Sequence, residues 1–156
     1  MPGRCRSGLL AALLSLSCVA VLAGCDPEPS EVEVVPAETF TEGVAKDSEA
    51  GAFRVVLSAD DGLAVGENTL RLRLGFHDPQ DPAAPGRGIP GADVSVYAWM
   101  PHGDGALDGV RGVYVGDGEY ELALELPEPG VWQLDFDLAV GDGVDDSVSF
   151  AFVIGE

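Results

Sequence analysis

The stretch that decides the fold is Leu70-Arg71-Leu72-Arg73-Leu74-Gly75-Phe76, in which apolar side chains recur at every second position. Successive side chains of an extended strand point to opposite faces, so the leucines and Phe76 are expected on one face and the arginines on the other. Such alternation is typical of a strand with one buried and one wet face. The same pattern returns at 120–126, 132–140 and 148–154.

Turn residues separate these segments. The stretch 116–118 reads Gly-Asp-Gly, as a tight hairpin would, and 127–130 ends in a glycine that can take positive φ. Further strands are expected at 53–58, 94–100 and 111–115. With no helical periodicity, the sequence predicts an all-β chain with a single immunoglobulin-like β-sandwich of about seven antiparallel strands.

The first 24 residues have the features of a secretory leader. Arg4 and Arg6 are followed by an apolar run from Leu9 to Leu22, too short to be a stable membrane span. The run closes with Leu22-Ala23-Gly24-Cys25, which has the form of a bacterial lipobox. We therefore expect a lipoprotein signal peptide over 1–24, with acyl chains on Cys25 that tether the chain to a membrane. The protein would face the periplasm or the exterior, and which membrane holds it stays open.

An acidic stretch separates Cys25 from the first expected strand. Residues 26–51 are rich in Glu, Pro, Ser and Ala, a composition that buries too little surface to offset chain entropy. We expect the lipidated cysteine and a disordered, flexible tether over 25–51, and one sandwich domain over 52–156. A short edge strand around Val32, Val34 and Val35 is the alternative.

Composition restricts the function. The chain has 27 acidic and 8 basic residues and a formal net charge of −19, so no nucleic-acid binding is expected. Without the leader, and with Cys25 lipidated, no thiol is left for a disulfide or a nucleophile. The sequence also has no G-x-S-x-G or H-E-x-x-H motif and no nucleotide-binding glycine loop. We therefore expect no enzyme activity.

The order of the motifs resembles a known family. A strand ending near Phe76 is followed by Gly88-Ile89-Pro90-Gly91-Ala92, then Trp99-Met100-Pro101-His102-Gly103, then Pro129-Gly130-Val131-Trp132. Over roughly 53–154 the chain resembles the YtkA-like domain family, whose relatives include FixH-type proteins linked to copper supply for respiratory oxidases. The resemblance implies a role in copper handling. Members often carry further Met and His residues after Met-Pro, where this chain has Gly103-Asp104-Gly105.

Two candidate sites follow from these residues. Met100 and His102 offer a thioether and an imidazole, which suit copper, the one candidate cofactor. The alternative is that Met100 caps the core and the neighbouring acids form turns. Tyr97 and Trp99 are expected on the outward face of their strand, where they would contact a protein partner unless a loop covers them. Asp142, Asp145 and Asp146 are either calcium ligands or solvated turn residues.

These observations leave two functional expectations. The first is a membrane-anchored envelope lipoprotein that acts as a non-enzymatic binding or accessory protein in copper handling. The second is a protein–protein interaction or structural module of an envelope assembly, with no metal. Antiparallel strands would place His77 and His102 at opposite ends of the sandwich, so the two histidines are not expected to bind one ion.

Overall fold

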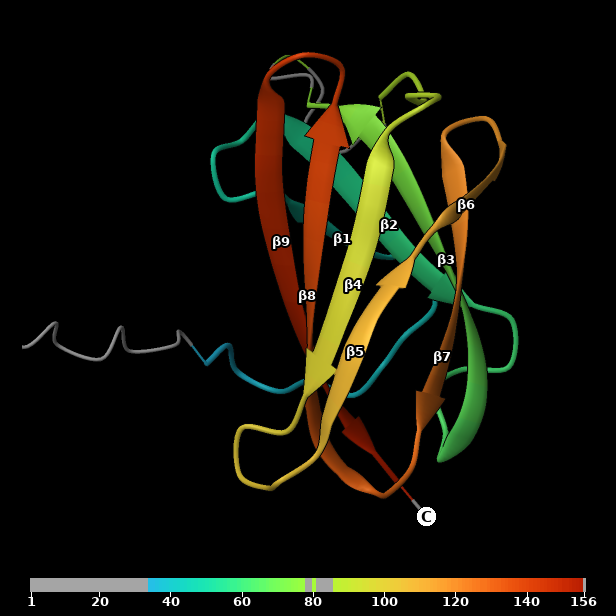
Figure 1. Cartoon of the computed structure of the whole chain (residues 1–156), viewed down its shortest axis with the longest axis vertical. Coiled ribbons are helices and arrows are strands. Elements are labelled where there is room, and N and C mark those ends of the chain that lie inside the picture. Colours follow the sequence, from blue (N-terminus) through green and yellow to red (C-terminus); the bar gives the residue numbers. More distant parts are fainter. Residues whose placement is uncertain (1–33, 78–79, 81–85, 156) are drawn as a thin grey trace, which may run out of the picture. The chain divides into compact units, whose positions relative to one another are not determined.

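The computed structural model describes residues 34–77, 80 and 86–155, and every regular element in these ranges is a strand (Figure 1). None of the described residues forms a helix that could cross a membrane. The predicted leader, Cys25 and the first part of the predicted tether lie outside the described residues. The nine strands are β1 Val44–Asp47, β2 Phe53–Ala59, β3 Gly66–Phe76, β4 Asp93–Trp99, β5 Ala106–Arg111, β6 Val113–Gly116, β7 Glu119–Leu126, β8 Gly130–Val140 and β9 Val144–Ile154.

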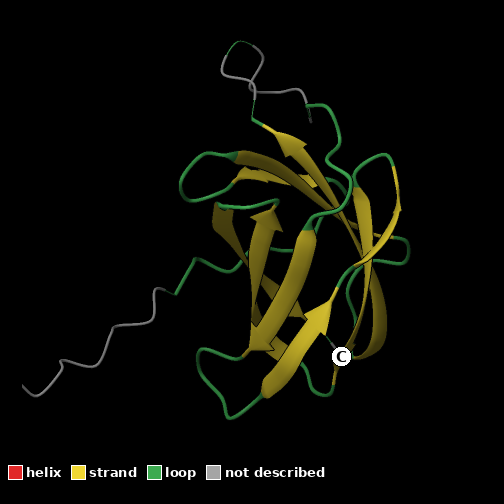
Figure 2. Cartoon of the chain, turned by 45° about the horizontal axis from the view of Figure 1, so that its top comes forward, coloured by secondary structure: helices red, strands yellow, loops and turns green. Residues whose placement is uncertain are grey.

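The strands form two open sheets, seen from a second direction in Figure 2. One has five strands in the order β1-β2-β3-β7-β6, and the other has four in the order β5-β4-β8-β9. All ladders between the named strands are antiparallel. The inward side chains of both sheets share one core, which confirms the predicted all-β sandwich.

The period-two pattern sets the core. Leu70, Leu72 and Leu74 of β3 are fully buried, as are the inward aromatic residues of β8. Each such side chain stabilises the fold by about 1.5–3 kcal/mol before the cost of ordering it. Phe76 is an exception, because its side chain is 52% exposed. It lies opposite Phe53 at the end of β3, which is at the edge of the hydrophobic core.

The folded part begins upstream of the predicted boundary. β1 pairs with β2, with Val44 opposite Leu57 and Asp47 opposite Arg54. Residues 34–51 therefore belong to the ordered part, and the expected tether over 25–51 is corrected for them. These residues have the composition of a tether, but their few apolar side chains pack against residues far along the sequence. Composition alone does not predict such long-range contacts.

We name residues 34–49 the strap, because they close the free edge of β9. The Glu38 N–H donates to the Ala151 carbonyl (2.9 Å), and the Glu38 carbonyl accepts the Val153 N–H (3.0 Å). Phe40 packs edge-on against Phe152, with ring centroids 5.1 Å apart. An edge strand covered in this way offers fewer unpaired backbone groups to other chains.

The strap continues along β9. Lys46 Nζ donates to the Ser149 carbonyl (3.0 Å) and lies 4.9 Å from the centre of the Phe150 ring. The Glu49 N–H then donates to the Ser147 carbonyl (2.8 Å). The strap thus bridges the edges of the two sheets, since β1 ends one sheet and β9 ends the other.

β5 and β6 form one segment that changes sheets at Gly112. The Gly112 N–H donates to the Val94 carbonyl (2.8 Å), and a Cβ at this position would lie 3.2 Å from the Tyr120 Cβ. The strand expected at 111–115 corresponds to β6. β5, over 106–111, was not expected, because an edge strand with mostly exposed side chains carries no alternation to reveal it.

The strand pairing confirms that His77 and His102 lie at opposite ends of the sandwich. Gly66 lies opposite Leu126, and Trp99 lies opposite Gln133, so one end of the sandwich gathers the turns that join β2 to β3, β4 to β5 and β7 to β8. His102 lies at this end and His77 at the other. The opposite end carries the described parts of 77–92 and the turns at 116–118 and 141–143.

Candidate functional site

The outward face of β4 carries the predicted aromatic pair. Val94, Val96 and Ala98 point inward and are buried, so the residues between them face out. The Tyr97 side chain is 47% exposed and that of Trp99 is half-buried. The predicted outward orientation of both rings is confirmed.

Trp99 is held by a carboxylate on the neighbouring strand. Its Nε1–H donates to Asp135 Oδ2 (2.6 Å), and Gln133 Nε2 donates to Asp135 Oδ1 (2.9 Å). Gln133 is only 2% exposed, and its Oε1 accepts the Val35 N–H of the strap (3.2 Å). The indole orientation is therefore fixed by a polar chain that begins in the strap.

Tyr97 lies over a glycine of the edge strand. The β4–β5 ladder has an irregularity there, with Asp108 and Gly109 opposite Tyr97. A Cβ on Gly109 would lie 2.6 Å from Tyr97 Cε1, so a larger residue at 109 would displace the ring. One ring face thus packs on backbone, and about half of the side chain is left for contact with another molecule.

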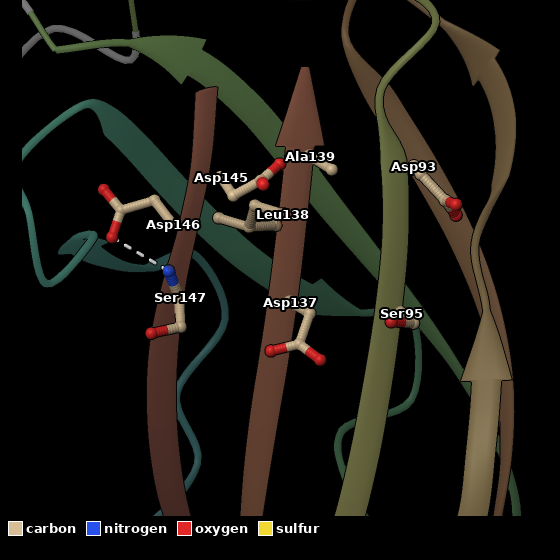
Figure 3. A pocket seen from close by; sticks show the side chains of 8 residues that line it. All are labelled: Asp93, Ser95, Asp137, Leu138, Ala139, Asp145, Asp146 and Ser147. Carbon is tan, nitrogen blue, oxygen red and sulfur yellow. Dashed lines mark hydrogen bonds between the residues drawn. The ribbon is translucent and has the colours of Figure 1, made fainter. Parts of the chain in front are cut away.

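An acidic hollow lies further along the same face, at the end opposite to Trp99 (Figure 3). It has a volume of about 540 Å³. All its charged lining residues are aspartates, and within the described parts of the chain the only basic residue that forms an ion pair with one of them is Arg111, 3.7 Å from Asp93. The lining residues are Asp93, Ser95, Asp137, Leu138, Ala139, Asp145, Asp146 and Ser147.

The Asp146 side chain points away from that of Asp145 and stabilises the fold. Its Oδ2 accepts hydrogen bonds from the Ser48 hydroxyl and the Ala52 N–H (3.2 Å). Its Oδ1 accepts the N–H groups of Ala50 (2.9 Å) and Ser147 (2.8 Å). Burial opposes ionisation, but these four donors outweigh it and hold the pKa of Asp146 below its usual range. Asp146 therefore caps the β1–β2 turn.

The Met100 side chain packs against one end of the hydrophobic core. Its N–H donates to the Gly105 carbonyl (2.8 Å), which closes the β4–β5 turn. A Cβ on Gly105 would lie 2.9 Å from Met100 Sδ, and one on Gly130 would lie 2.3 Å from Met100 Cε. The thioether thus sits against bare backbone, as the core-capping alternative predicts.

The other predicted metal ligand shares this turn. His102 is exposed, two residues beyond Met100, while His77 lies at the opposite end, 3.1 Å from Asp47. The described residues contain no group of three His, Cys, Asp or Glu side chains placed to hold a metal ion. The turn therefore offers two copper-type donors, one of them packed in the core. Cys25, the predicted lipidation site, lies outside the described residues.

Sequence reasoning missed the residues that support the aromatic pair. Alternation alone places Gln133 and Asp135 on the outward face, but their pairing with Trp99 depends on the register between β4 and β8. Register is a long-range property that no local pattern in this chain indicates. The Val35 contact was missed for the same reason.

Comparison with known proteins gives one match. Residues 47–137 match the family model described as YtkA-like, which confirms the resemblance found in the sequence. Comparison with curated proteins yields no match. Comparison with solved structures also yields none.

Proposed function

The chain belongs to the YtkA-like family, and we propose that it is a membrane-anchored envelope lipoprotein that binds another protein and catalyses no reaction. The proposed contact surface is the outer face of β4 and β8. The observation that carries this proposal is Tyr97, 47% exposed beside an indole that Asp135 holds in place. Aromatic residues of this kind are typical anchors of protein interfaces.

The charge of the face indicates the kind of partner. Asp93, Asp137 and Asp145 lie on the same face as Tyr97. A partner that presents lysine or arginine side chains would gain ion pairs with these carboxylates and a cation–π contact with the exposed ring. Because such charges lie at the surface, the association should weaken as salt is raised.

Substitution of Tyr97 tests this surface. We expect Tyr97→Ala to leave the fold intact and to lose most of a partner that co-purifies with the wild-type protein from native membranes. A matched control is Val144→Ala, since Val144 is 43% exposed on β9 and should retain the partner. Equal recovery of the partner with both variants would contradict the proposal.

Copper handling at the β4–β5 turn is the second candidate function. Its support is that Met100 and His102 share one short turn and that their donor atoms suit copper. We expect the mature protein to bind Cu(I) with sub-micromolar affinity and His102→Ala to lose that binding. His77→Ala is the matched control, because His77 lies at the other end of the sandwich. Unchanged affinity in His102→Ala would reject the site.

A further inference from the structure

Three hydrogen bonds in series link the strap to the proposed contact surface. The Val35 N–H of the strap donates to Gln133 Oε1 (3.2 Å). Gln133 Nε2 donates to Asp135 Oδ1 (2.9 Å), and Trp99 Nε1 donates to Asp135 Oδ2 (2.6 Å). We name this series the relay. It connects the backbone of the strap to a side chain of β4 by way of β8.

The relay has a fixed direction, because its members differ in what they can donate and accept. Carboxylate oxygens only accept, so Asp135 takes the NH₂ group of Gln133 and leaves the amide oxygen toward the strap. A backbone N–H only donates, and Val35 supplies one at that oxygen. The reversed amide would place oxygen against oxygen at Asp135 and donor against donor at Val35. The strap therefore helps to orient the Gln133 amide, and the amide helps to orient the Asp135 carboxylate.

The part of the strap that starts the relay is held by few contacts. Residues 34–38 bond to β8 through Val35 and to β9 through Glu38. Val35 is half-buried, and the other four residues of this segment are exposed. Segments with few buried contacts open locally at a free energy below that of global unfolding. Residues 34–38 can therefore separate from β8 and β9 while the sandwich stays folded.

We propose that the strap regulates the contact surface through the relay. With the strap in place, Asp135 holds the Trp99 indole beside Tyr97 in the orientation that a partner meets. When residues 34–38 separate, the relay loses its first hydrogen bond, Gln133 and Asp135 become more mobile, and the indole samples other orientations. A surface that is less preorganised binds more weakly. This regulation rests on the proposed function, whereas the relay itself does not.

Coupling of this kind is reciprocal. A partner bound at Tyr97 and Trp99 would hold Asp135 and Gln133 in their places, and would thereby favour the attached strap. The size of the coupling is set by the hydrogen bond from Val35, since one such bond shifts an equilibrium by roughly two- to tenfold. The regulation is therefore graded, with weaker binding when the strap is open and stronger binding when it is attached.

Replacement of Val35 by proline removes the first hydrogen bond of the relay. Val35 precedes Pro36, so it is already biased toward extended conformations that a proline also adopts. Val35→Ala is the matched control, because it shortens the same side chain and keeps the N–H. The relay predicts a change at Trp99 in Val35→Pro and none in Val35→Ala.

The indole N–H signals of the full-length protein, labelled with ¹⁵N and purified in detergent, measure this change. The chain has two tryptophans. Trp132 is the internal reference, since it is fully buried and its Nε1–H donates to the Glu128 carbonyl (3.0 Å). Val35→Pro should shift and broaden the Trp99 signal and leave that of Trp132 in place. Identical Trp99 signals in Val35→Pro and Val35→Ala would overturn the relay.

A second substitution tests whether the effect passes through the Gln133 amide. Gln133→Met keeps the length of the side chain but cannot donate to Asp135, so the Trp99 signal should shift even with an unaltered strap. In the Gln133→Met chain, the addition of Val35→Pro should shift the Trp99 signal no further, because the relay is already broken. A further shift would overturn the relay, since the strap would then act on Trp99 by another route.

Recovery of a co-purifying partner from native membranes tests the regulation. Val35→Pro should recover roughly two- to tenfold less partner than Val35→Ala. Loss of the partner in Tyr97→Ala, together with equal recovery by the two Val35 variants, would overturn the regulation and leave the proposed function standing. If Tyr97→Ala keeps every partner, the proposed function fails and the regulation with it, while the indole signals still decide the relay. Circular dichroism shows whether each variant retains the sandwich.

Discussion

At the scale of single residues, Asp146 shows how one acid in an acidic cluster becomes structural. Asp142, Asp145 and Asp146 are alike in sequence, but only Asp146 meets the donors of the β1–β2 turn. Its neighbour Asp145 lines the hollow on the outer face. The sequence predicts the cluster, whereas the different roles of Asp145 and Asp146 depend on which side of β9 each residue faces.

We predict that Asp146→Ala lowers the free energy of unfolding by about 2–3 kcal/mol, because four hydrogen bonds to a charged acceptor are lost. Asp142→Ala, at an exposed turn position, should change it by less than about 0.5 kcal/mol. Chemical denaturation measures both. Similar values for the two variants would show that Asp146 does not cap the turn.

The same residue gives a pH dependence with a definite sign. The pKa of Asp146 is lower in the folded chain than its ordinary value of 3.8. Its contribution to stability is therefore present above that value and is lost as the pH falls through the folded pKa. Unfolding followed from about pH 6 to pH 2 should show a smaller acid-induced loss for Asp146→Ala than for the wild-type chain.

At the scale of elements, the strap holds residues 34–49 to the edge of β9. We predict that Phe40→Ala lowers stability by about 1–2 kcal/mol, since it removes the edge-on contact with Phe152. The amides of Glu38 and Val153 should then exchange hydrogen faster, because their bonds close the same edge. Val34→Ala, at a position 48% exposed, is the matched control. Unchanged exchange at Val153 in Phe40→Ala would argue against a strap.

Elements were predictable where one face is buried. The alternation in β3, β7, β8 and β9 follows directly from their inward side chains, so these strands were predicted from sequence. β1 and β5 are edge strands with few buried residues, so their local pattern resembles that of loops. β6 is also an edge strand, but it overlaps the strand expected at 111–115. The outward direction of Tyr97 and Trp99 was predictable from alternation. Their support by Asp135 was not, because it depends on strand register.

At the scale of the whole molecule, the proposed anchor is open to a direct measurement. We predict that the native protein starts at Cys25 and carries acyl chains there, because the lipobox ends at that residue. Mass spectrometry of the protein from native membranes measures the loss of residues 1–24 and the added lipid mass. A chain that retains its leader, or an unmodified Cys25, would contradict the anchored state.

The strap has a mechanical consequence. A pull on the chain from before residue 34 enters the sandwich at Val35 and Glu38, which are bonded to Gln133, Ala151 and Val153. These few bonds would bear the load first, and they would break before any tension reached the buried side chains of β8. The loosened strap would release Gln133 from Val35 while leaving the core closed. A force on the N-terminal side would thus remove one of the hydrogen bonds that hold Gln133, and through Asp135 it would affect the orientation of Trp99 without unfolding the domain.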